Sequence, residues 1–269
     1  MVAPQPRAVA GGLPVIDAHV HVTEDGRWFQ THHDASLERL LREMDEAEVE
    51  RAVILPIPGA LDNEGAARLV ARAPERLIGF GCVDFDRPLA PQLERAKELG
   101  LRGLKVHPRL QGIPLEDPRV DELCAGASAR GLPALFCAYP QCRDPKVPLR
   151  SIEPYAYDLL AKRHPDLVLI LAHLGGHRAL DAYFVAKSNP NVYLDASYVL
   201  QALRHTSAYQ DYLFVLEHLD RKVLFGSDFP EVSLPDYARL AREAMAGLAS
   251  CDREAVCGGN LRRILGEAV

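Results

Sequence analysis

The stretch VIDAHVHV, residues 15–22, combines an apolar strand pattern with three polar side chains, Asp17, His19 and His21. Because side chains alternate across a strand, we predict that these three groups share one face, which in a closed barrel is the interior. Two imidazoles two residues apart at the end of a strand can reach one metal ion together, while Asp17 could orient one of them. Hydrogen-bonded core histidines are the alternative, but two buried on one face without a partner would be costly.

Seven further apolar runs, rich in Val, Ile, Leu and Phe, follow this stretch at intervals of roughly 30 residues, the length of one βαβ unit. They begin near residues 51, 77, 101, 132, 167, 191 and 222. Such near-continuous apolar strands indicate burial on both faces, as in a parallel sheet. Helical patterns separate the runs, the clearest at residues 36–48, where leucine and methionine recur at i, i+3, i+4 and i+7.

Eight strands that alternate with helices predict an α/β fold, a single-domain (β/α)8 TIM barrel over residues 13–269, with a loose N-terminal segment at residues 1–12. The length of 269 residues is close to that of a typical barrel of this kind. A doubly wound open sheet would show the same alternation of elements. No glycine-rich dinucleotide or phosphate-binding motif follows any predicted strand, which counts against the nucleotide-binding form of that alternative.

The composition is that of an ordinary globular protein and argues against several classes of function. The formal charge of −6 gives no reason to expect a nucleic-acid partner, so a small-molecule substrate is favoured. No apolar run approaches the roughly 20 residues of a membrane helix, and residues 1–12 lack the apolar stretch of a signal peptide. We therefore expect a cytoplasmic protein without membrane attachment. The cysteines contain no CxxC pair and are expected to be reduced thiols. The oligomeric state stays open, and a homodimer would be unsurprising.

Polar residues also stand at the ends of the later predicted strands. They are Lys105, His107, His173, Asp195, Ser197 and Asp228. Strand ends converge at one mouth of a barrel, which is where barrel enzymes build their sites. Structural alternatives exist, because Lys105 and Asp195 could form an ion pair and Asp228, in GSDFP, could form a turn. Polar residues at so many strand ends are nevertheless hard to explain by packing alone.

In these motifs the chain resembles the amidohydrolase-related group that includes aminocarboxymuconate-semialdehyde decarboxylase and related metal-dependent hydrolases and decarboxylases. The matching motifs are VIDAHVHV at 15–22, GLKVHP at 103–108, LAHLGG at 171–176, NVYLDAS at 191–197, LFGSDFP at 224–230 and GGNLRRILG at 258–266. Each motif is weak alone, but their order and spacing across nearly the whole chain are specific. The resemblance implies a barrel enzyme that uses one divalent metal ion, with Zn²⁺ as the first choice.

By this resemblance, His19 and His21 match the first two metal ligands, and Asp228 matches the ligand on the eighth strand. His173 matches the catalytic or second-metal histidine of the sixth strand. One departure is that Cys137 stands where the group has a fifth-strand histidine ligand. A cysteine can bind zinc as a thiolate and preserve the site. Alternatively, Cys137 is a small buried hydrophobe, and the metal is weaker, differently coordinated or absent.

Three functions follow from these residues. The favoured one is metal-dependent hydrolysis of a small lactone, amide or ester, with Asp228 or His173 moving the proton, because hydrolysis is the broader chemistry of the superfamily. The second is metal-dependent decarboxylation of a small carboxylic acid. The third is a metal-free barrel that only binds a ligand, which the missing fifth-strand histidine motivates. Three basic residues near the mouth are expected to bind the substrate, namely Lys105, His107 and Arg178.

Specificity in this fold is expected to reside in the loops that follow the strands. The predicted loops are residues 23–35, 108–118 and 139–151. The last of them contains Arg143, Lys146 and Arg150, so the substrate is expected to carry an anionic group. Solvated surface charge explains these three residues equally well.

Overall fold

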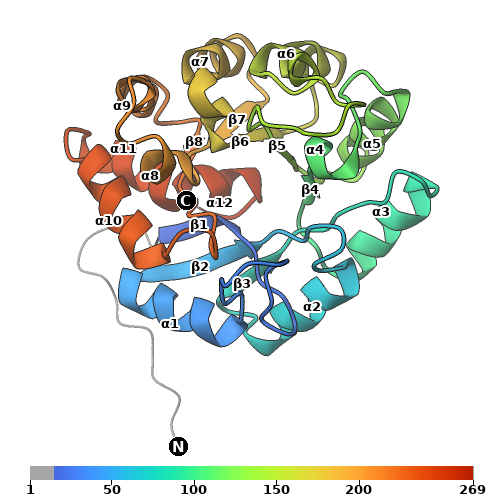
Figure 1. The fold of residues 1–269 in the computed structure, drawn as a ribbon, viewed down its shortest axis with the longest axis horizontal. Helices are drawn as coiled ribbons and strands as arrows, with labels where there is room; N and C mark the ends of the chain where they lie inside the picture. Colours follow the sequence, from blue (N-terminus) through green and yellow to red (C-terminus); the bar gives the residue numbers. More distant parts are fainter. Residues whose placement is uncertain (1–14, 269) are drawn as a thin grey trace, which may run out of the picture.

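The computed structural model describes residues 15–268 and shows eight parallel strands ringed by helices (Figure 1). The strands are β1 (Val15–Val20), β2 (Val49–Ile54), β3 (Leu77–Gly79), β4 (Leu104–Val106), β5 (Ala134–Cys137), β6 (Leu169–Ala172), β7 (Val192–Asp195) and β8 (Val223–Leu224). Neighbours pair in the orders β1-β2-β3 and β4-β5-β6-β7-β8. A bridge between Gly81 and Leu104 joins the two groups on one side. On the other side the Ala18 amide donates to the Phe225 carbonyl at 2.8 Å. The predicted (β/α)8 barrel is confirmed.

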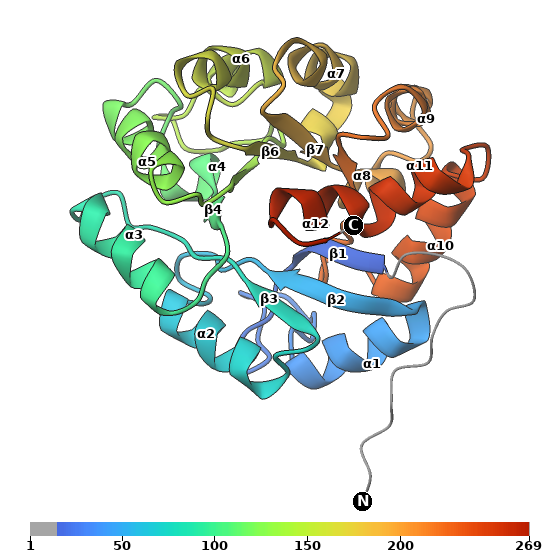
Figure 2. The same ribbon diagram turned by 180° about the vertical axis from the view of Figure 1, so that it is seen from behind.

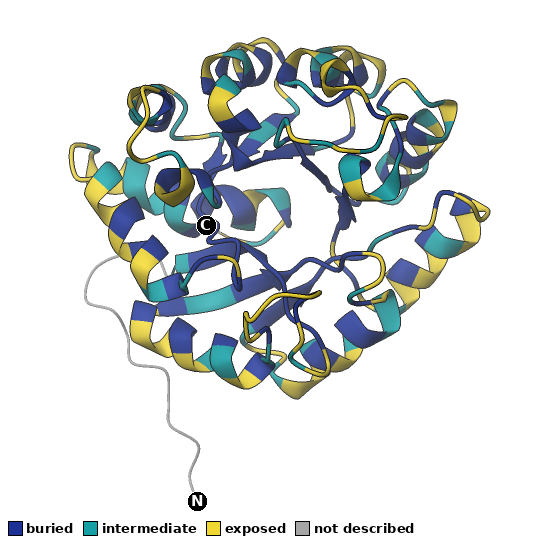
Figure 3. Ribbon diagram, in the orientation of Figure 1, coloured by how far each residue is buried: buried dark blue, intermediate teal, exposed yellow. Residues whose placement is uncertain are grey.

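The helices form the outer layer, with buried faces toward the strands and exposed faces toward solvent (Figure 3). The longer ones are α1 (Leu37–Ala47), α2 (Asn63–Arg72), α3 (Leu89–Glu98), α5 (Pro118–Ser128), α6 (Pro154–Arg163), α7 (Ala179–Ser188), α9 (Ala208–His218) and α10 (Leu234–Ala244). Shorter ones are α4 (Pro108–Gln111), α8 (Val199–Ala202), α11 (Ser250–Glu254) and α12 (Asn260–Ile264). The predicted helix at residues 36–48 corresponds to α1, which Ser36 caps by accepting the Arg39 amide at 3.3 Å. None of the helices within residues 15–268 is long and apolar enough to cross a membrane.

Strand alternation divides the apolar side chains into two cores. One set fills the barrel interior, with Ile16, Val53, Leu135 and Ile170 among its members. The other lies between the strands and the helices, where Phe136 packs in the outer cluster. Burial on both faces explains why the strands read as near-continuous apolar runs in the sequence. The segment predicted to be loose, residues 1–12, lies outside the described residues.

The first strand departs from strict alternation. Asp17 pairs with Ala52 on β2 and Val20 pairs with Ile54, so three steps along β1 match two steps along β2. This irregularity is a bulge, and it puts the residues after Ala18 out of phase with those before it. The expectation that Asp17 shares a face with the two histidines is therefore wrong. Its Oδ1 instead accepts the backbone amides of His19 and Ser227, at 2.9 and 3.0 Å.

The end of the barrel at which the strands begin is closed by the C-terminal residues. Viewed from behind, α12 lies across the middle of the ring (Figure 2). Leu261 and Leu265 belong to the interior core cluster, so this segment is packed from within. The Glu267 carboxylate binds both terminal nitrogens of Arg51, and two further arginines, Arg102 and Arg262, lie 3.6 and 3.7 Å from it. One carboxylate thus ties the chain end to β2 and to the start of β4.

We expect Glu267→Gln to lower the free energy of unfolding by about 1–3 kcal/mol at pH 7, because it leaves partly buried guanidinium groups without their counter-charge. Hydrogen bonding to Arg51 lowers the pKa of Glu267. Its stabilising effect is therefore present above the carboxyl's unfolded-state pKa and is lost as pH falls below about 4. Urea unfolding of both proteins at pH 7 and below pH 4 measures the difference. The control is Glu98→Gln, an exposed partner of Arg95; an equal effect of the two changes would contradict this account.

Candidate metal and substrate site

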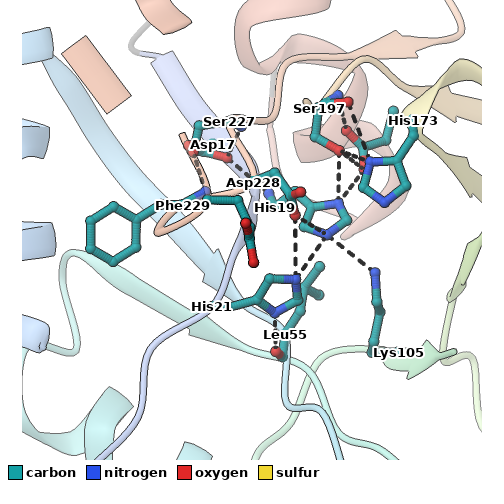
Figure 4. Close-up of polar contacts among 12 residues, drawn as sticks. Asp17, His19, His21, Leu55, Lys105, His173, Ser197, Ser227, Asp228 and Phe229 are labelled. Carbon is teal, nitrogen blue, oxygen red and sulfur yellow. Dashed lines mark hydrogen bonds and ion pairs between the residues drawn. The ribbon is translucent and has the colours of Figure 1, made fainter. Parts of the chain in front are cut away.

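Three ligand atoms converge at the mouth of the barrel. The Nε2 atoms of His19 and His21 lie 3.2 Å apart, and Asp228 Oδ1 lies 3.2 and 3.4 Å from them (Figure 4). All three side chains are buried. Among residues 15–268, these three form the group of His, Cys, Asp and Glu ligand atoms that lie within 4.8 Å of one another. The structure thus brings together the two strand-one histidines and the strand-eight aspartate that the sequence analysis singled out.

The hydrogen bonds at Nδ1 of His19 and His21 determine whether each Nε2 atom carries a proton or a free lone pair. His21 Nδ1 lies 2.8 Å from the Leu55 carbonyl, which only accepts, so Nδ1 carries the proton and Nε2 presents a lone pair. His19 Nδ1 lies 2.5 Å from Asp195 Oδ2, which assigns the same tautomer to His19. Burial, and then the charge of Lys105, lowers the pKa of His19 well below its usual range. Two lone pairs and a carboxylate therefore face one another, an arrangement that could hold a cation between them.

Asp228 reaches this group from the turn that follows β8. Its backbone has a φ of 71°, and its amide donates to the His19 carbonyl at 2.9 Å. Gly226 permits the close approach, because a Cβ there would lie 2.6 Å from Asp195 Oδ1 and 2.9 Å from His19 Cβ. Burial opposes ionisation of Asp228, but His19, His21 and His173 outweigh it and lower the pKa of the carboxyl well below its usual range. The group therefore offers a full negative charge, and its donor set fits a divalent metal ion.

Residues after β7 hold the imidazoles in place. Ser197 Oγ lies 3.0 Å from Asp195 Oδ2. It also lies 3.0 Å from His173 Nδ1 (Figure 4). Burial raises the pKa of Asp195 to about 6. Within residues 15–268, Asp195 pairs with His19, so the ion pair with Lys105 that the sequence left open does not form. Asp195 therefore orients the His19 ring, the role that the sequence analysis gave to Asp17.

Lys105 on β4 and His107, directly after that strand, lie beside the group. Lys105 is buried, and its Nζ lies 3.1 Å from His19 Nε2. His107 is buried too, and its Nδ1 has no hydrogen-bond partner among the described residues. Burial lowers the pKa of His107 to about 4, so its ring is neutral at pH 7. Both side chains thus take the positions that the sequence analysis gave them, at the mouth.

Cys137 faces the barrel interior at the end of β5, and it is not one of the three ligand atoms that converge. Its thiol lies against the imidazoles of His107 and His173 and near the Arg109 guanidinium. Burial acts to raise the pKa of the thiol, but the two histidines lower it well below its usual range. That Cys137 is a metal ligand stays a prediction.

A pocket of about 300 Å³ opens onto two of the three ligand side chains, His21 and Asp228. Its lining residues are His21, Trp28, Phe29, Ile57, Lys105, His107, Arg109, Leu110, Tyr139, Gln141, His173, Tyr198, Asp228 and Glu231. All three loops that the sequence analysis selected contribute, through Trp28, Arg109 and Tyr139 among others. A larger hollow of about 620 Å³ lies over the loops after β2 and β3 and contains none of the predicted site residues.

The structure places Arg178 away from this pocket. Its guanidinium pairs with Asp181 on α7 and lies 4.0 Å from Glu153, so its charge is already matched. Sequence reasoning missed Arg109, which lines the pocket two residues beyond His107. Its Nε is buried without a hydrogen-bond partner, and within residues 15–268 it forms no ion pair within 4.0 Å. The signal that could have found it is its place directly after the fourth-strand motif.

Aromatic rings form the pocket walls. Trp28 stacks on His21, with ring centroids 5.0 Å apart and planes at 19°, and its indole Nε1 donates to Glu231 at 2.5 Å. On the other side, Tyr139 and Tyr198 contact each other and the His173 ring edge to face. Such walls suit a small flat molecule that approaches the three ligand atoms.

Residues 16–266 match the sequence model of the family described as amidohydrolase. The chain belongs to this amidohydrolase family. Among solved structures with its fold is an uncharacterised TIM-barrel protein from Bordetella bronchiseptica, at 20% identity and a TM-score of 0.79, covering 94% of this chain and 99% of that one. A search of curated proteins finds no match.

Two further amidohydrolase-like structures have named activities. One is 5-carboxyvanillate decarboxylase from Sphingomonas paucimobilis, at 18% identity and a TM-score of 0.70, covering 95% of this chain and all (100%) of that one. The other is a probable 2-pyrone-4,6-dicarboxylic acid hydrolase from Acinetobacter baumannii with citric acid bound, at 16% identity and a TM-score of 0.72, covering 94% and 100%. At these identities the likeness concerns the fold, and the fold serves both hydrolysis and decarboxylation.

Cobalt substitution tests Cys137 as a ligand of this amidohydrolase. If the thiolate binds, the cobalt-loaded protein shows an intense near-ultraviolet charge-transfer band, which Cys137→Ser removes while cobalt is retained at lower affinity. Binding of this kind requires the thiol to turn from His107 and His173 toward the three ligand atoms. Cys124→Ser, a buried cysteine on α5, is the matched control. If the band is absent, or survives Cys137→Ser, the metal rests on His19, His21, Asp228 and solvent.

Proposed function

We propose that this protein is a metal-dependent hydrolase of a small carbonyl compound, namely a lactone, an amide or an ester. We further propose that this substrate carries an acidic group. The observation that supports the proposal most is the meeting of two imidazole lone pairs with the Asp228 carboxylate, beside a pocket that His21 and Asp228 help to line. We assign the metal to His19, His21 and Asp228, with zinc as the ion that two imidazoles and a carboxylate suit best. A divalent ion held by these side chains would act as a Lewis acid toward the substrate carbonyl.

Two side chains can move the proton that hydrolysis requires. Asp228 lines the pocket, and its carboxylate can accept a proton from an attacking water. His173 also lines the pocket, and Ser197 engages its Nδ1 through a hydroxyl at 3.0 Å and a carbonyl at 3.3 Å. The carbonyl can only accept, so Nδ1 keeps its proton and Nε2 is the atom left to exchange one with substrate. We therefore give Asp228 the role of base and His173 the role of acid toward the leaving group.

The basic side chains at the end of β4 and on α4 suit the acidic group of the substrate. Arg109 has no carboxylate partner among the described residues, and its Nε is buried without an acceptor. Lys105 and His107 line the same part of the pocket. An unpaired donor in a pocket is costly until a ligand satisfies it, so a carboxylate on the substrate would gain a charge-assisted hydrogen bond there.

Decarboxylation is the second candidate. The same ligand atoms could hold a substrate carboxylate, and Lys105, 3.1 Å from His19 Nε2, lies where charge would develop as carbon dioxide leaves. The analysis of products separates the two reactions, because a hydrolase adds water across the bond that it cleaves, while a decarboxylase releases carbon dioxide. A protein that purifies without metal and shows neither reaction would instead be the metal-free binding barrel.

We expect Asp228→Asn to lower the turnover of a hydrolysed substrate by roughly 10²- to 10⁴-fold, since an amide can neither accept a proton nor supply the charge of the ligand. Zinc-loaded protein is first screened against lactones, amides, esters and aromatic carboxylates, and product analysis identifies the reaction. The control is Asp236→Asn, an exposed aspartate on α10. Near-normal turnover by Asp228→Asn would remove this residue from the mechanism, and carbon dioxide as the product would replace the hydrolase by the decarboxylase.

We expect Arg109→Met to weaken the binding of benzoate by roughly 10- to 100-fold, because it removes a charge-assisted hydrogen bond from the pocket. The chain has one tryptophan, Trp28, which lines the pocket, so its fluorescence reports occupancy directly. Benzamide, the neutral analogue, should bind the variant and the parent protein alike. Arg178→Met is the matched control. If Arg178→Met weakens benzoate binding and Arg109→Met does not, the anionic group is bound by the residue that the sequence analysis named.

A further inference from the structure

We propose that Lys105 occupies the metal-binding lone pair of His19 in the metal-free protein, and that metal binding releases its amine into the substrate pocket. The inference rests on the metal site of the proposed function and assigns Lys105 a role in loading that site. The observation behind it is a single contact, because Lys105 Nζ lies 3.1 Å from the very Nε2 atom that the metal would use (Figure 4).

The tautomer of His19 fixes the direction of this contact. His19 Nδ1 is engaged by Asp195 at 2.5 Å and by Ser197 Oγ at 3.0 Å, so the ring proton lies on Nδ1. Nε2 is then an acceptor, and the Lys105 amine is the donor that faces it. One imidazole lone pair serves either an N–H donor or a metal ion. The two states exclude each other at His19, whether the amine is charged or neutral.

Nothing else among residues 15–268 holds the amine in place. Lys105 is 1% exposed, and it forms no ion pair within 4.0 Å and no second hydrogen bond. A buried lysine is ordinarily paired with a carboxylate. Lys222 shows the contrast, since its amine donates to backbone carbonyls of Ala186 and Asn189, each at 2.7 Å. Among these residues the amine of Lys105 is therefore held by His19 Nε2 alone, and a metal ion on that atom would leave the amine without a partner.

The pocket gives the released amine a destination. Lys105 belongs to its lining, which also includes Arg109 and Gln141. A carboxylate bound there would pair with an amine that the metal-free protein keeps on His19. The metal ion and the anionic ligand would then favour each other's binding, because each favours the conformation in which the Lys105 amine lies in the pocket. The protein would bind its acidic substrate well only after the metal is in place.

Zinc affinity of the purified chain, measured by competition with a chromophoric chelator, tests the first half of the proposal. Lys105→Met keeps the length and volume of the side chain but cannot donate, and we expect it to bind zinc at least tenfold more tightly than the parent protein. Lys162→Met removes an equal charge from the surface of α6 and should change nothing. His19→Ala, which removes the contested ligand atom, should abolish tight binding in both backgrounds. Thermal melts establish that each variant is folded.

Labelling of the unmodified chain tests the second half and does not depend on any variant. Reductive methylation, read by peptide mass spectrometry, should modify Lys105 several-fold faster in the zinc-loaded protein than in the metal-free protein. The exposed Lys162 in the same sample is the internal control and should react equally in both.

The outcomes separate this proposal from the proposed function. Equal zinc affinities for Lys105→Met and the parent protein, or labelling of Lys105 that zinc leaves unchanged, would overturn the capping role while the metal site stands. Weaker zinc binding by Lys105→Met, with slower labelling in zinc, would show that Lys105 is itself a ligand. If neither protein binds zinc, the metal-dependent function fails together with the inference.

Discussion

The rest of this site depends on one constraint, the close approach of two imidazole lone pairs and a carboxylate. His19 Nε2, His21 Nε2 and Asp228 Oδ1 lie within 3.4 Å of one another. In water such groups would turn apart, and in a buried site they stay together only if the surroundings fix each of them. Asp195 fixes the His19 ring, and the Leu55 carbonyl fixes the His21 ring. Each supporting group binds Nδ1 and leaves Nε2 for the centre. The three atoms of the cluster could therefore hold a cation.

Closure of the barrel supplies this rigidity. The carboxylate of Asp17 accepts the amides of His19 on β1 and Ser227 beyond β8, so a single side chain joins the first strand to the last at the level of the site. Gly226 lets the chain after β8 pass close enough for Asp228 to reach the histidines. At the opposite end, Glu267 ties the chain terminus to three arginines. Contacts between β1 and the chain after β8 thus hold the polar cluster at the mouth of the barrel, while the C-terminal residues close the apolar core of the barrel at the opposite end.

Much of this arrangement can be predicted from the sequence, because it follows from the spacing of the apolar runs and from the polar residues at the ends of those runs. Eight apolar runs at regular spacing predict a parallel sheet, and once that sheet closes into a barrel the polar residues at the strand ends meet at one mouth. What the sequence hides are departures from regularity. A bulge in β1 separates Asp17 from the histidines that follow it, and no local signal marks it. Arg178 and Arg109 look equivalent as basic residues near strand ends. Only tertiary contacts show that Arg178 is already paired while Arg109 is not.

Strand six shows why the site needs such departures. Ile170 and Ala172 point into the barrel, so strict alternation would send the next side chain, His173, outward among the helices. The backbone instead turns left-handed at His173 and Leu174, with φ values of 62° and 47°, and the ring reaches the pocket. A left-handed residue that is not glycine costs about 1–3 kcal/mol and persists only where its surroundings enforce it. Pocket-lining residues in the same region of φ recur on other loops, namely Phe29, Tyr198 and Asp228. The stable barrel offsets this local cost, and at His173 the left-handed turn brings into the pocket a ring that strand geometry alone would turn away.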